Sequence, residues 1–174
     1  CNNERVDDNA QVCNNARVYD NAKVYGNARV CDDAIVRDDA RVFVNAQIYD
    51  NAVVVGNAKV CDNAQIYDDA IVHDDTIVCG DAEVSGDAEV SGNARICGDA
   101  QICGDAIISS NKDYIIFKNW WSSGRFFTWT RSNNMWKVGC FYGTGEELIA
   151  KAYKDSEESG REYECIVKYV ESII

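Results

Sequence analysis

His73 is the only histidine in the chain, which makes it the first candidate for acid–base chemistry. A histidine with a pKa near neutrality can serve as a general base. No glycine-rich phosphate loop and no Cys–His arrangement accompanies it, and a serine nucleophile would lack a nearby base. We therefore expect no catalytic residue and interpret His73 as a surface or interface histidine.

The nine cysteines could form disulfides or bind a soft metal. Their odd number and their placement favour free thiols in a reducing compartment. Cys61, Cys79 and Cys97 are spaced by 18 residues and could form a thiol ladder, but no CxxC pair or second ligand type accompanies them. We expect no metal site and no cofactor.

Acidic residues are concentrated in one part of the chain. Residues 61–110 contain eleven Asp and Glu but a single base, Arg95, whereas residues 111–174 contain nine acids and nine bases. Aspartate is common in turns and favours solubility, which can explain the pattern without a function. Stacked carboxylates could also bind Ca²⁺, although the glycine-rich nonapeptide of calcium solenoids is absent, or imitate a nucleic-acid backbone. The candidate partner-binding acids are Asp32, Asp33, Asp50, Asp68, Asp69, Asp74, Asp75, Asp87 and Asp105.

A six-residue repeat must position these side chains. Every sixth residue from Val6 to Ile108 is Val or Ile, and the residue two positions earlier is Ala from Ala10 to Ala106, except at Thr76. The unit Ala-x-Val-x predicts a short strand with Ala and Val facing inward, and the following Asp/Gly-Asn/Asp pair predicts a turn. No insertion interrupts the register.

This pattern resembles the hexapeptide-repeat family, in which three hexapeptides form one triangular coil of 18 residues. The resemblance covers about 105 residues and implies a left-handed parallel β-helix of about six coils, roughly 29 Å long at about 4.8 Å per coil. We expect a mainly β protein with the solenoid in residues 1–110. The family includes carbonic anhydrases, which need three metal-binding histidines, and acyltransferases, which carry a catalytic His and loops that interrupt the repeat. The chain has one histidine and no such loop.

Arranging the outward residues by coil predicts three different faces. The first combines a basic column with aromatic residues and thiols, and the second is rich in Gln. The third is apolar, and such a face is expected to be covered by a second subunit, by the C-terminal segment or by another protein. The residues of this oligomer or docking face are Tyr19, Ile35, Val53, Val55, Ile71 and Ile107.

Residues 111–174 follow a different pattern and predict a small α+β module that could cap the last coil. Three apolar stretches separated by turn-like breaks predict a three-stranded antiparallel sheet. Two helices should follow, one with a capping box at Thr144 and Glu147 and one with a capping box at Ser159 and Glu162. Most of the four tryptophans should lie in the core, while one or two could form an interaction surface. The candidates for this module surface are Trp120, Trp121, Trp129 and Trp136.

These features favour a non-enzymatic, protein-binding solenoid that forms a homodimer. Uninterrupted repeats that end in such a module resemble proteins of bacteriophages and gut bacteria, which suggests an anti-CRISPR-like inhibitor of a host nucleic-acid-handling defence protein. The partner would be a basic nucleic-acid-binding protein, because the negative field disfavours direct binding of nucleic acid. A hexapeptide-type acyltransferase, or its inactive relative, is the alternative. No segment predicts a membrane span or signal sequence, so we expect a cytoplasmic location, in the bacterial host if the protein is phage-encoded.

Overall fold

The computed structural model describes residues 5–174, and its first part is a parallel β-solenoid of six turns. Each turn contributes one two-residue strand to each of three six-stranded sheets, so strands paired within a sheet are 18 residues apart. Sheet A contains β1 (Arg5–Val6), β4 (Lys23–Val24), β7 (Arg41–Val42), β10 (Lys59–Val60), β13 (Ile77–Val78) and β16 (Arg95–Ile96). Sheet B contains β2 (Gln11–Val12), β5 (Arg29–Val30), β8 (Gln47–Ile48), β11 (Gln65–Ile66), β14 (Glu83–Val84) and β17 (Gln101–Ile102). Sheet C contains β3 (Arg17–Val18), β6 (Ile35–Val36), β9 (Val53–Val54), β12 (Ile71–Val72), β15 (Glu89–Val90) and β18 (Ile107–Ile108).

The repeated alanines and branched aliphatic residues form one continuous core along the solenoid. The Val or Ile of every repeat from Val24 to Ile108 has no exposed surface, and the alanines from Ala22 to Ala106 are equally buried. Thr76, which replaces one alanine, is also fully buried, and its hydroxyl donates a hydrogen bond to the His73 carbonyl at 2.6 Å. The hexapeptide-type β-helix predicted from the repeat is therefore confirmed.

The turns between strands require left-handed backbone, which explains the Asp, Asn and Gly at these positions. The first residue of each turn pair has a positive φ, as at Asp32 (62°), Asp68 (57°) and Gly86 (70°). Val44 differs from the other turn residues with positive φ, which are Asp, Asn or Gly, because it is β-branched and still has a φ of 65°.

A four-stranded antiparallel sheet follows the solenoid, in the order β19, β20, β21 and β22. Its strands are β19 (Tyr114–Lys118), β20 (Phe126–Thr130), β21 (Met135–Val138) and β22 (Phe141–Gly143). The prediction of three strands was wrong because the last apolar stretch is a hairpin. Its chain turns at Gly139, which has a φ of 56°, and Phe141 pairs with Val138.

Two helices complete the chain, α1 (Gly145–Asp155) and α2 (Glu157–Ile173). The predicted capping box of α1 is present, with Thr144 and Glu147 satisfying each other's backbone N–H groups. The predicted cap of α2 was wrong, because Ser156 is the N-cap and accepts a hydrogen bond from the Ser159 backbone. The helix therefore begins at Glu157, earlier than the Ser-x-x-Glu pattern at Ser159 and Glu162 indicated.

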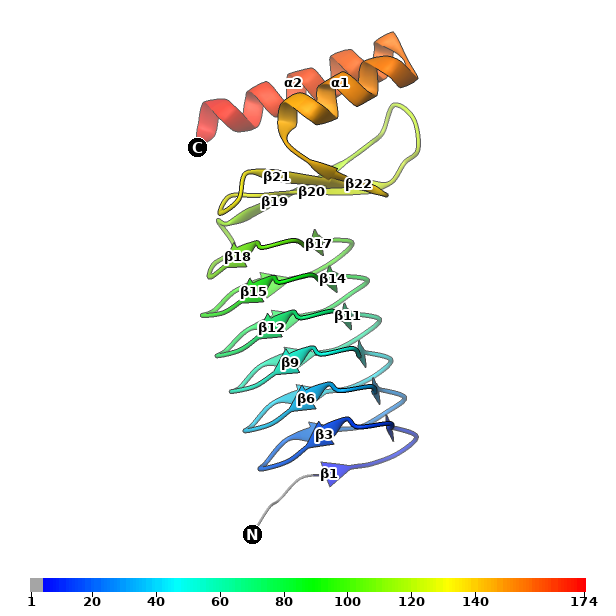
Figure 1. Ribbon diagram of the computed structural model, residues 1–174, viewed down its shortest axis with the longest axis vertical. Helices are drawn as coiled ribbons and strands as arrows, with labels where there is room; N and C mark the ends of the chain where they lie inside the picture. Colours follow the sequence, from blue (N-terminus) through cyan, green and yellow to red (C-terminus); the bar gives the residue numbers. More distant parts are fainter. Residues whose placement is uncertain (1–4) are drawn as a thin grey trace.

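The sheet lies across the end of the solenoid, and both helices lie beyond it (Figure 1). Alternate side chains of β19 divide between two cores, since Ile116 contacts the solenoid core whereas Phe117 contacts the core beneath the helices. This alternation makes the C-terminal module a cap for the last coil.

No helix in residues 5–174 is both long enough and apolar enough to cross a membrane.

Candidate protein-binding surfaces

The predicted acids lie on two corners of the solenoid. Most are in turns that connect sheet B to sheet C, where they line up from coil to coil. We call this row the acidic ridge, and it comprises Asp32, Asp33, Asp50, Asp68, Asp69, Asp87 and Asp105. Asp74 and Asp75 are exposed in a turn that connects sheet C to sheet A, so the structure separates them from the ridge.

Hydrogen bonds between coils hold the ridge carboxylates in place. Asp68 accepts a hydrogen bond from the Gly86 backbone N–H at 3.1 Å, and Asp69 accepts one from the Asn51 amide at 3.0 Å. Asp50 similarly accepts a bond from the Asp68 backbone at 3.4 Å. Each of these bonds crosses one coil, so successive carboxylates repeat at the spacing of the coils, about 4.8 Å. These acids therefore stabilise the turns and also present a regular row of negative charge.

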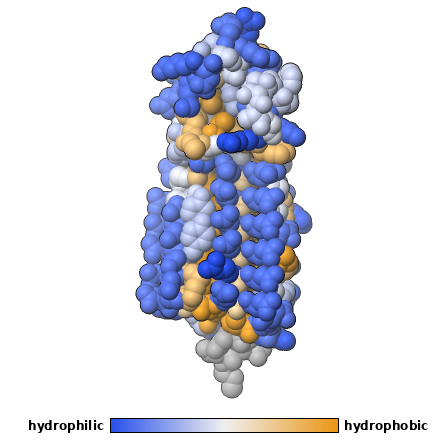
Figure 2. Space-filling view, turned by 90° about the vertical axis from the view of Figure 1, so that its right-hand side faces the viewer, coloured by the Kyte–Doolittle hydropathy of each residue, from blue (hydrophilic) through white to orange (hydrophobic). Residues whose placement is uncertain are grey.

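The surface around the ridge is strongly polar. In the view of Figure 2, hydrophilic side chains form continuous columns along most of the solenoid, and a paler column lies beside them. Tyr49 and Tyr67 stack on sheet B with ring centroids 5.0 Å apart, as Tyr25 and Phe43 do on sheet A at 5.1 Å. Burial is the largest factor that raises the pKa of Tyr49 to about 12, so its hydroxyl stays protonated.

The predicted docking face is sheet C, but its apolar column is interrupted. Ile35, Val53 and Val55 are half-buried, and Ile71 is 41% exposed. Glu89 lies between Ile71 and Ile107 in the strand register, so Ile107, at 53% exposure, is separated from the other apolar residues. Tyr19 lies at the N-terminal end of this face, with the Arg17 guanidinium 5.6 Å from its ring centroid.

His73 lies on the same face and contacts two carboxylates. Its Nε2 is 3.0 Å from Glu89 Oε1, and its Nδ1 is 3.3 Å from Asp74 Oδ2. Burial alone would lower the pKa of His73, but the hydrogen bonds that its ring nitrogens donate to Glu89 and Asp74 together raise this pKa. The Gly92 backbone N–H and then His73 lower the pKa of Asp74. Because both ring nitrogens have carboxylate partners, the geometry favours a protonated, structural imidazole over a free base.

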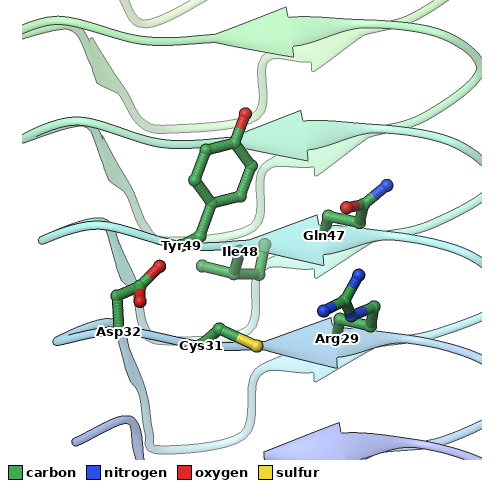
Figure 3. Close-up of a pocket in the computed structure, with 6 residues that line it drawn as sticks. All are labelled: Arg29, Cys31, Asp32, Gln47, Ile48 and Tyr49. Carbon is green, nitrogen blue, oxygen red and sulfur yellow. The ribbon is translucent and has the colours of Figure 1, made fainter. Parts of the chain in front are cut away.

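The hollows on the solenoid surface are shallow. One of about 210 Å³ lies on sheet B and is lined by Arg29, Cys31, Asp32, Gln47, Ile48 and Tyr49 (Figure 3). Arg29 and Gln47 lie one above the other on neighbouring strands, and Tyr49 points away from Asp32. The sulfur in this hollow belongs to a disulfide, so it offers no thiolate nucleophile.

That disulfide joins Cys13 to Cys31 in neighbouring coils, with 4.7 Å between their Cα atoms. The expectation of free thiols was therefore wrong for this pair. The sequence contained the signal, because residues 18 apart at an outward position lie within disulfide distance.

Cys61, Cys79 and Cys97 have the same spacing and remain free thiols. Burial is the largest factor that raises the pKa of Cys79 to about 12, and its neighbours Cys97 and Cys61 raise it further. Among residues 5–174, no group of three or more His, Cys, Asp or Glu side chains could hold a metal ion.

The four tryptophans of the C-terminal module do not form one surface. Trp129 and Trp136 are only 1% exposed and belong to the module core, which corrects their assignment to the surface. Trp121 is half-buried and packs edge-on against Tyr163, with ring centroids 5.0 Å apart. Trp120 is 71% exposed and is the one tryptophan of the four that is open to a partner.

The C-terminal module also supplies polar caps that sequence reasoning missed. The backbone N–H groups of Arg95, Gln101 and Ile107 lie on the last strand of each solenoid sheet. They donate to Asn111 Oδ1 at 2.7 Å, Thr128 Oγ1 at 3.0 Å and Ser132 Oγ at 2.7 Å. These side-chain oxygens thus replace the carbonyl groups of a further coil, so the N–H groups at the edge of each sheet have hydrogen-bond partners.

Comparison with known families finds one match, confined to the solenoid. The model described as YdcK beta solenoid repeat matches residues 10–26, 22–38, 46–63 and 64–80. These ranges cover less than half of the chain, so the match identifies the type of repeat. No curated protein and no solved structure matches the chain.

Proposed function

We propose that this chain is a non-enzymatic binding protein whose acidic half, residues 61–110, binds a basic protein that normally handles nucleic acid. The observation that carries the proposal is the charge of this half, eleven acids against one base. The acids occur on turns and outward strand positions, and the turn acids Asp68, Asp69 and Asp87 are exposed.

The linear charge density of this half is close to that of DNA. Its 50 residues correspond to about 2.8 coils, or about 13 Å of axis at ~4.8 Å per coil. The net charge of −10 is therefore about one negative charge per 1.3 Å, and duplex DNA carries one per about 1.7 Å. A surface that binds phosphates through Lys and Arg would meet a similar field.

The rigidity of the solenoid supports recognition of a folded partner. Backbone bonds join each coil to the next, and cross-coil side-chain bonds such as Asn63 to Asp81 at 3.0 Å fix the turns. Carboxylates that are already held in place lose little conformational entropy on binding, which favours affinity. A binding role also suits the shallow hollows and the engaged ring nitrogens of His73.

A nuclease or related host defence protein is the partner class that best fits such a field. An inhibitor of this kind, anti-CRISPR-like in action and encoded by a phage, would occupy the nucleic-acid channel of its target. Its site of action would then be the bacterial cytoplasm.

The proposal is tested by capture on the immobilised chain from a nuclease-treated bacterial lysate at ~50 mM salt, followed by elution with duplex DNA. A basic nucleic-acid-binding protein should be retained, and DNA should displace it because both ligands use one site. Retention that resists DNA and ~500 mM salt would contradict the proposal, because the binding would not be electrostatic.

A matched pair of variants localises the binding surface. The ridge variant Asp68→Asn, Asp69→Asn, Asp87→Asn removes three charges but keeps side chains that accept turn hydrogen bonds and tolerate left-handed backbone. The control Glu146→Gln, Glu158→Gln, Glu171→Gln removes three charges from the helices. The ridge variant should retain less of the basic protein, and the control should retain as much as the wild type. Equal loss in both variants would show that binding depends on net charge and not on the ridge.

A further inference from the structure

On sheet C, five successive residues of one outward column have opposite charges at their two ends, and Ile107 follows them on the last strand. Arg17, Ile35, Val53, Ile71 and Glu89 follow one another on neighbouring strands. We call these five residues the sheet C strip. The strip is symmetric about Val53 in its types of side chain. An isoleucine lies on each side of Val53, and a charged residue lies at each end, a cation at one and a carboxylate at the other.

The middle of this strip is accessible apolar surface. Ile71 is 41% exposed, Ile35 and Val53 are half-buried, and Val55 continues the apolar area in the neighbouring column. The charged ends are also accessible, since Arg17 is exposed and the side chain of Glu89 is 46% exposed. Apolar area framed by charge in this way is typical of an interface.

We propose that the sheet C strip binds a second copy of the chain in an antiparallel arrangement, with the two-fold axis beside Val53. In this arrangement Val53 meets the same residue of the other copy, and Ile35 of each copy meets Ile71 of the other. Arg17 of each copy then lies opposite Glu89 of the other. The contact is isologous and closes as a dimer.

A parallel arrangement of the same faces is disfavoured by its contacts. A two-fold axis along the solenoid would place equal coils side by side and would exchange the two columns of the face. Ile35 would then lie opposite Arg37, and Ile71 opposite His73. Arg17 and Glu89 would lose their oppositely charged partners. The apolar contacts and the Arg17–Glu89 pairs therefore favour the antiparallel dimer, in which Arg37 lies opposite His73 and each of these two has a carboxylate neighbour in its own chain.

The distribution of charge along the axis favours the same choice. Residues 17–45 contain five acids and five bases, whereas residues 61–89 contain nine acids and no Lys or Arg. The antiparallel dimer places the first segment of each copy beside the second segment of the other. The parallel dimer would place the two strongly acidic segments side by side, at a cost in repulsion.

The antiparallel dimer also has a consequence for the acidic ridge, which borders the sheet C strip. The ridges of the two copies would run along one edge of the dimer, where water and salt screen their mutual repulsion. The two C-terminal modules would lie at opposite ends of the dimer, because each caps the last coil of its own solenoid (Figure 1). The inference does not depend on the proposed partner, which the outer surfaces could bind in either oligomeric state.

The size of the strip indicates a weak dimer. Five coils by four residues give a contact of about 24 Å by 13 Å on each copy, or roughly 600 Å² in total, which is below the usual size of a stable specific interface. We therefore expect a dissociation constant in the micromolar range. Sedimentation velocity between about 1 and 100 µM should show the monomer converting to a dimer as concentration rises.

Substitution at the centre of the strip tests the contact surface. Val53→Asp would place two carboxylates against each other at the axis and should weaken the dimer by at least about tenfold. Gln47→Asp is the matched control, since Gln47 occupies the equivalent outward position of the adjacent strand on sheet B. A wild-type chain that stays monomeric at 100 µM would overturn the proposal, as would a dimer that Val53→Asp leaves intact.

Charge exchange and crosslinking test the orientation. Arg17→Glu and Glu89→Arg should each weaken the dimer, and the double variant should restore it. In a background without the exposed Cys140 and Cys165, oxidation should crosslink a mixture of Ile35→Cys and Ile71→Cys chains more than either alone. Equal crosslinking in all three samples would overturn the antiparallel arrangement. The variant Trp120→Ala tests the other exposed candidate surface. If only this variant lost the dimer, the contact would belong to the C-terminal module and not to the sheet C strip.

Discussion

Individual residues of the solenoid differ mainly in how well they suit the turn or strand position they occupy. The turn pair needs a left-handed residue, which Asp, Asn or Gly supplies at little cost. The outward strand positions accept many residue types, and this tolerance permits a Cys, Tyr or His at equivalent places. Most single-residue functions must therefore be inferred from side-chain partners, and the repeat pattern alone does not reveal them.

Val44 is the residue with the clearest local strain. It is β-branched, has a φ of 65° and occupies a position that Gly26 and Asp62 fill in the neighbouring coils. Val44→Asn should raise the free energy of unfolding by about 1 kcal/mol, because asparagine tolerates this conformation better. Urea denaturation measures the change. Val44→Ala removes the branching alone and should give a smaller gain, whereas a loss of stability in Val44→Asn would contradict the strain.

His73 should make the stability of the fold depend on pH. Because hydrogen bonds to Glu89 and Asp74 raise its folded-state pKa, protonated His73 stabilises the fold. This contribution is complete below the unfolded pKa of about 6.5 and is lost as the pH rises through the folded pKa. His73→Gln should therefore cost more at pH 6 than at pH 8.5, by up to about 1 kcal/mol.

Urea denaturation of the wild type and His73→Gln at both pH values measures this difference. In a Glu89→Gln background the pH dependence should shrink, because one carboxylate partner is lost. An identical cost of His73→Gln at pH 6 and pH 8.5 would show that the imidazole stays neutral.

At the scale of elements, the sequence predicted what the repeat controls and missed what depends on contacts between distant segments. The six-residue period predicted every solenoid strand, since Ala and Val must face inward at each unit. The hairpin at Gly139 was missed because apolar residues continue on both sides of a two-residue turn. Ser156 was missed as the cap of α2 because it is followed three residues later by Ser159, whereas Ser159 itself begins a Ser-x-x-Glu pattern that ends at Glu162.

The polar cap of the last coil could not be predicted, because it joins residues far apart in the chain. Thr128 is 1% exposed and accepts the hydrogen bond from the Gln101 backbone. Thr128→Val should leave this buried N–H without a partner and lower the free energy of unfolding by about 1–3 kcal/mol. Thr128→Ser retains the hydroxyl and should restore most of the hydrogen bond.

Amide hydrogen exchange at Gln101, combined with urea denaturation, measures the effect of the cap. The Gln101 amide should exchange faster in Thr128→Val than in Thr128→Ser. Equal exchange in both variants would show that another group satisfies this N–H, and the cap would then have a packing role only.

At the scale of the whole molecule, the chain is a rigid rod with an uneven charge. The sequence predicted the charge asymmetry and the apolar face, and its 18-residue coil period implies that Asp74 and Asp75, one hexapeptide after Asp68 and Asp69, lie on a different corner from the ridge. It could not show that Trp129 and Trp136 are buried, because a tryptophan in a short strand can face either side of the sheet. The proposed binding surface therefore rests on the solenoid, with Trp120 as the remaining exposed tryptophan.

The proposed function depends most directly on the affinity of the acidic half for a captured basic protein. Isothermal titration calorimetry of that purified protein with the wild type and the ridge variant, at ~50 and ~200 mM salt, measures it. We expect the wild-type dissociation constant to rise at least about tenfold across this range and the ridge variant to bind more weakly at low salt. Equal affinity for the wild type and the ridge variant, unchanged by salt, would contradict binding through an imitation of the nucleic-acid backbone.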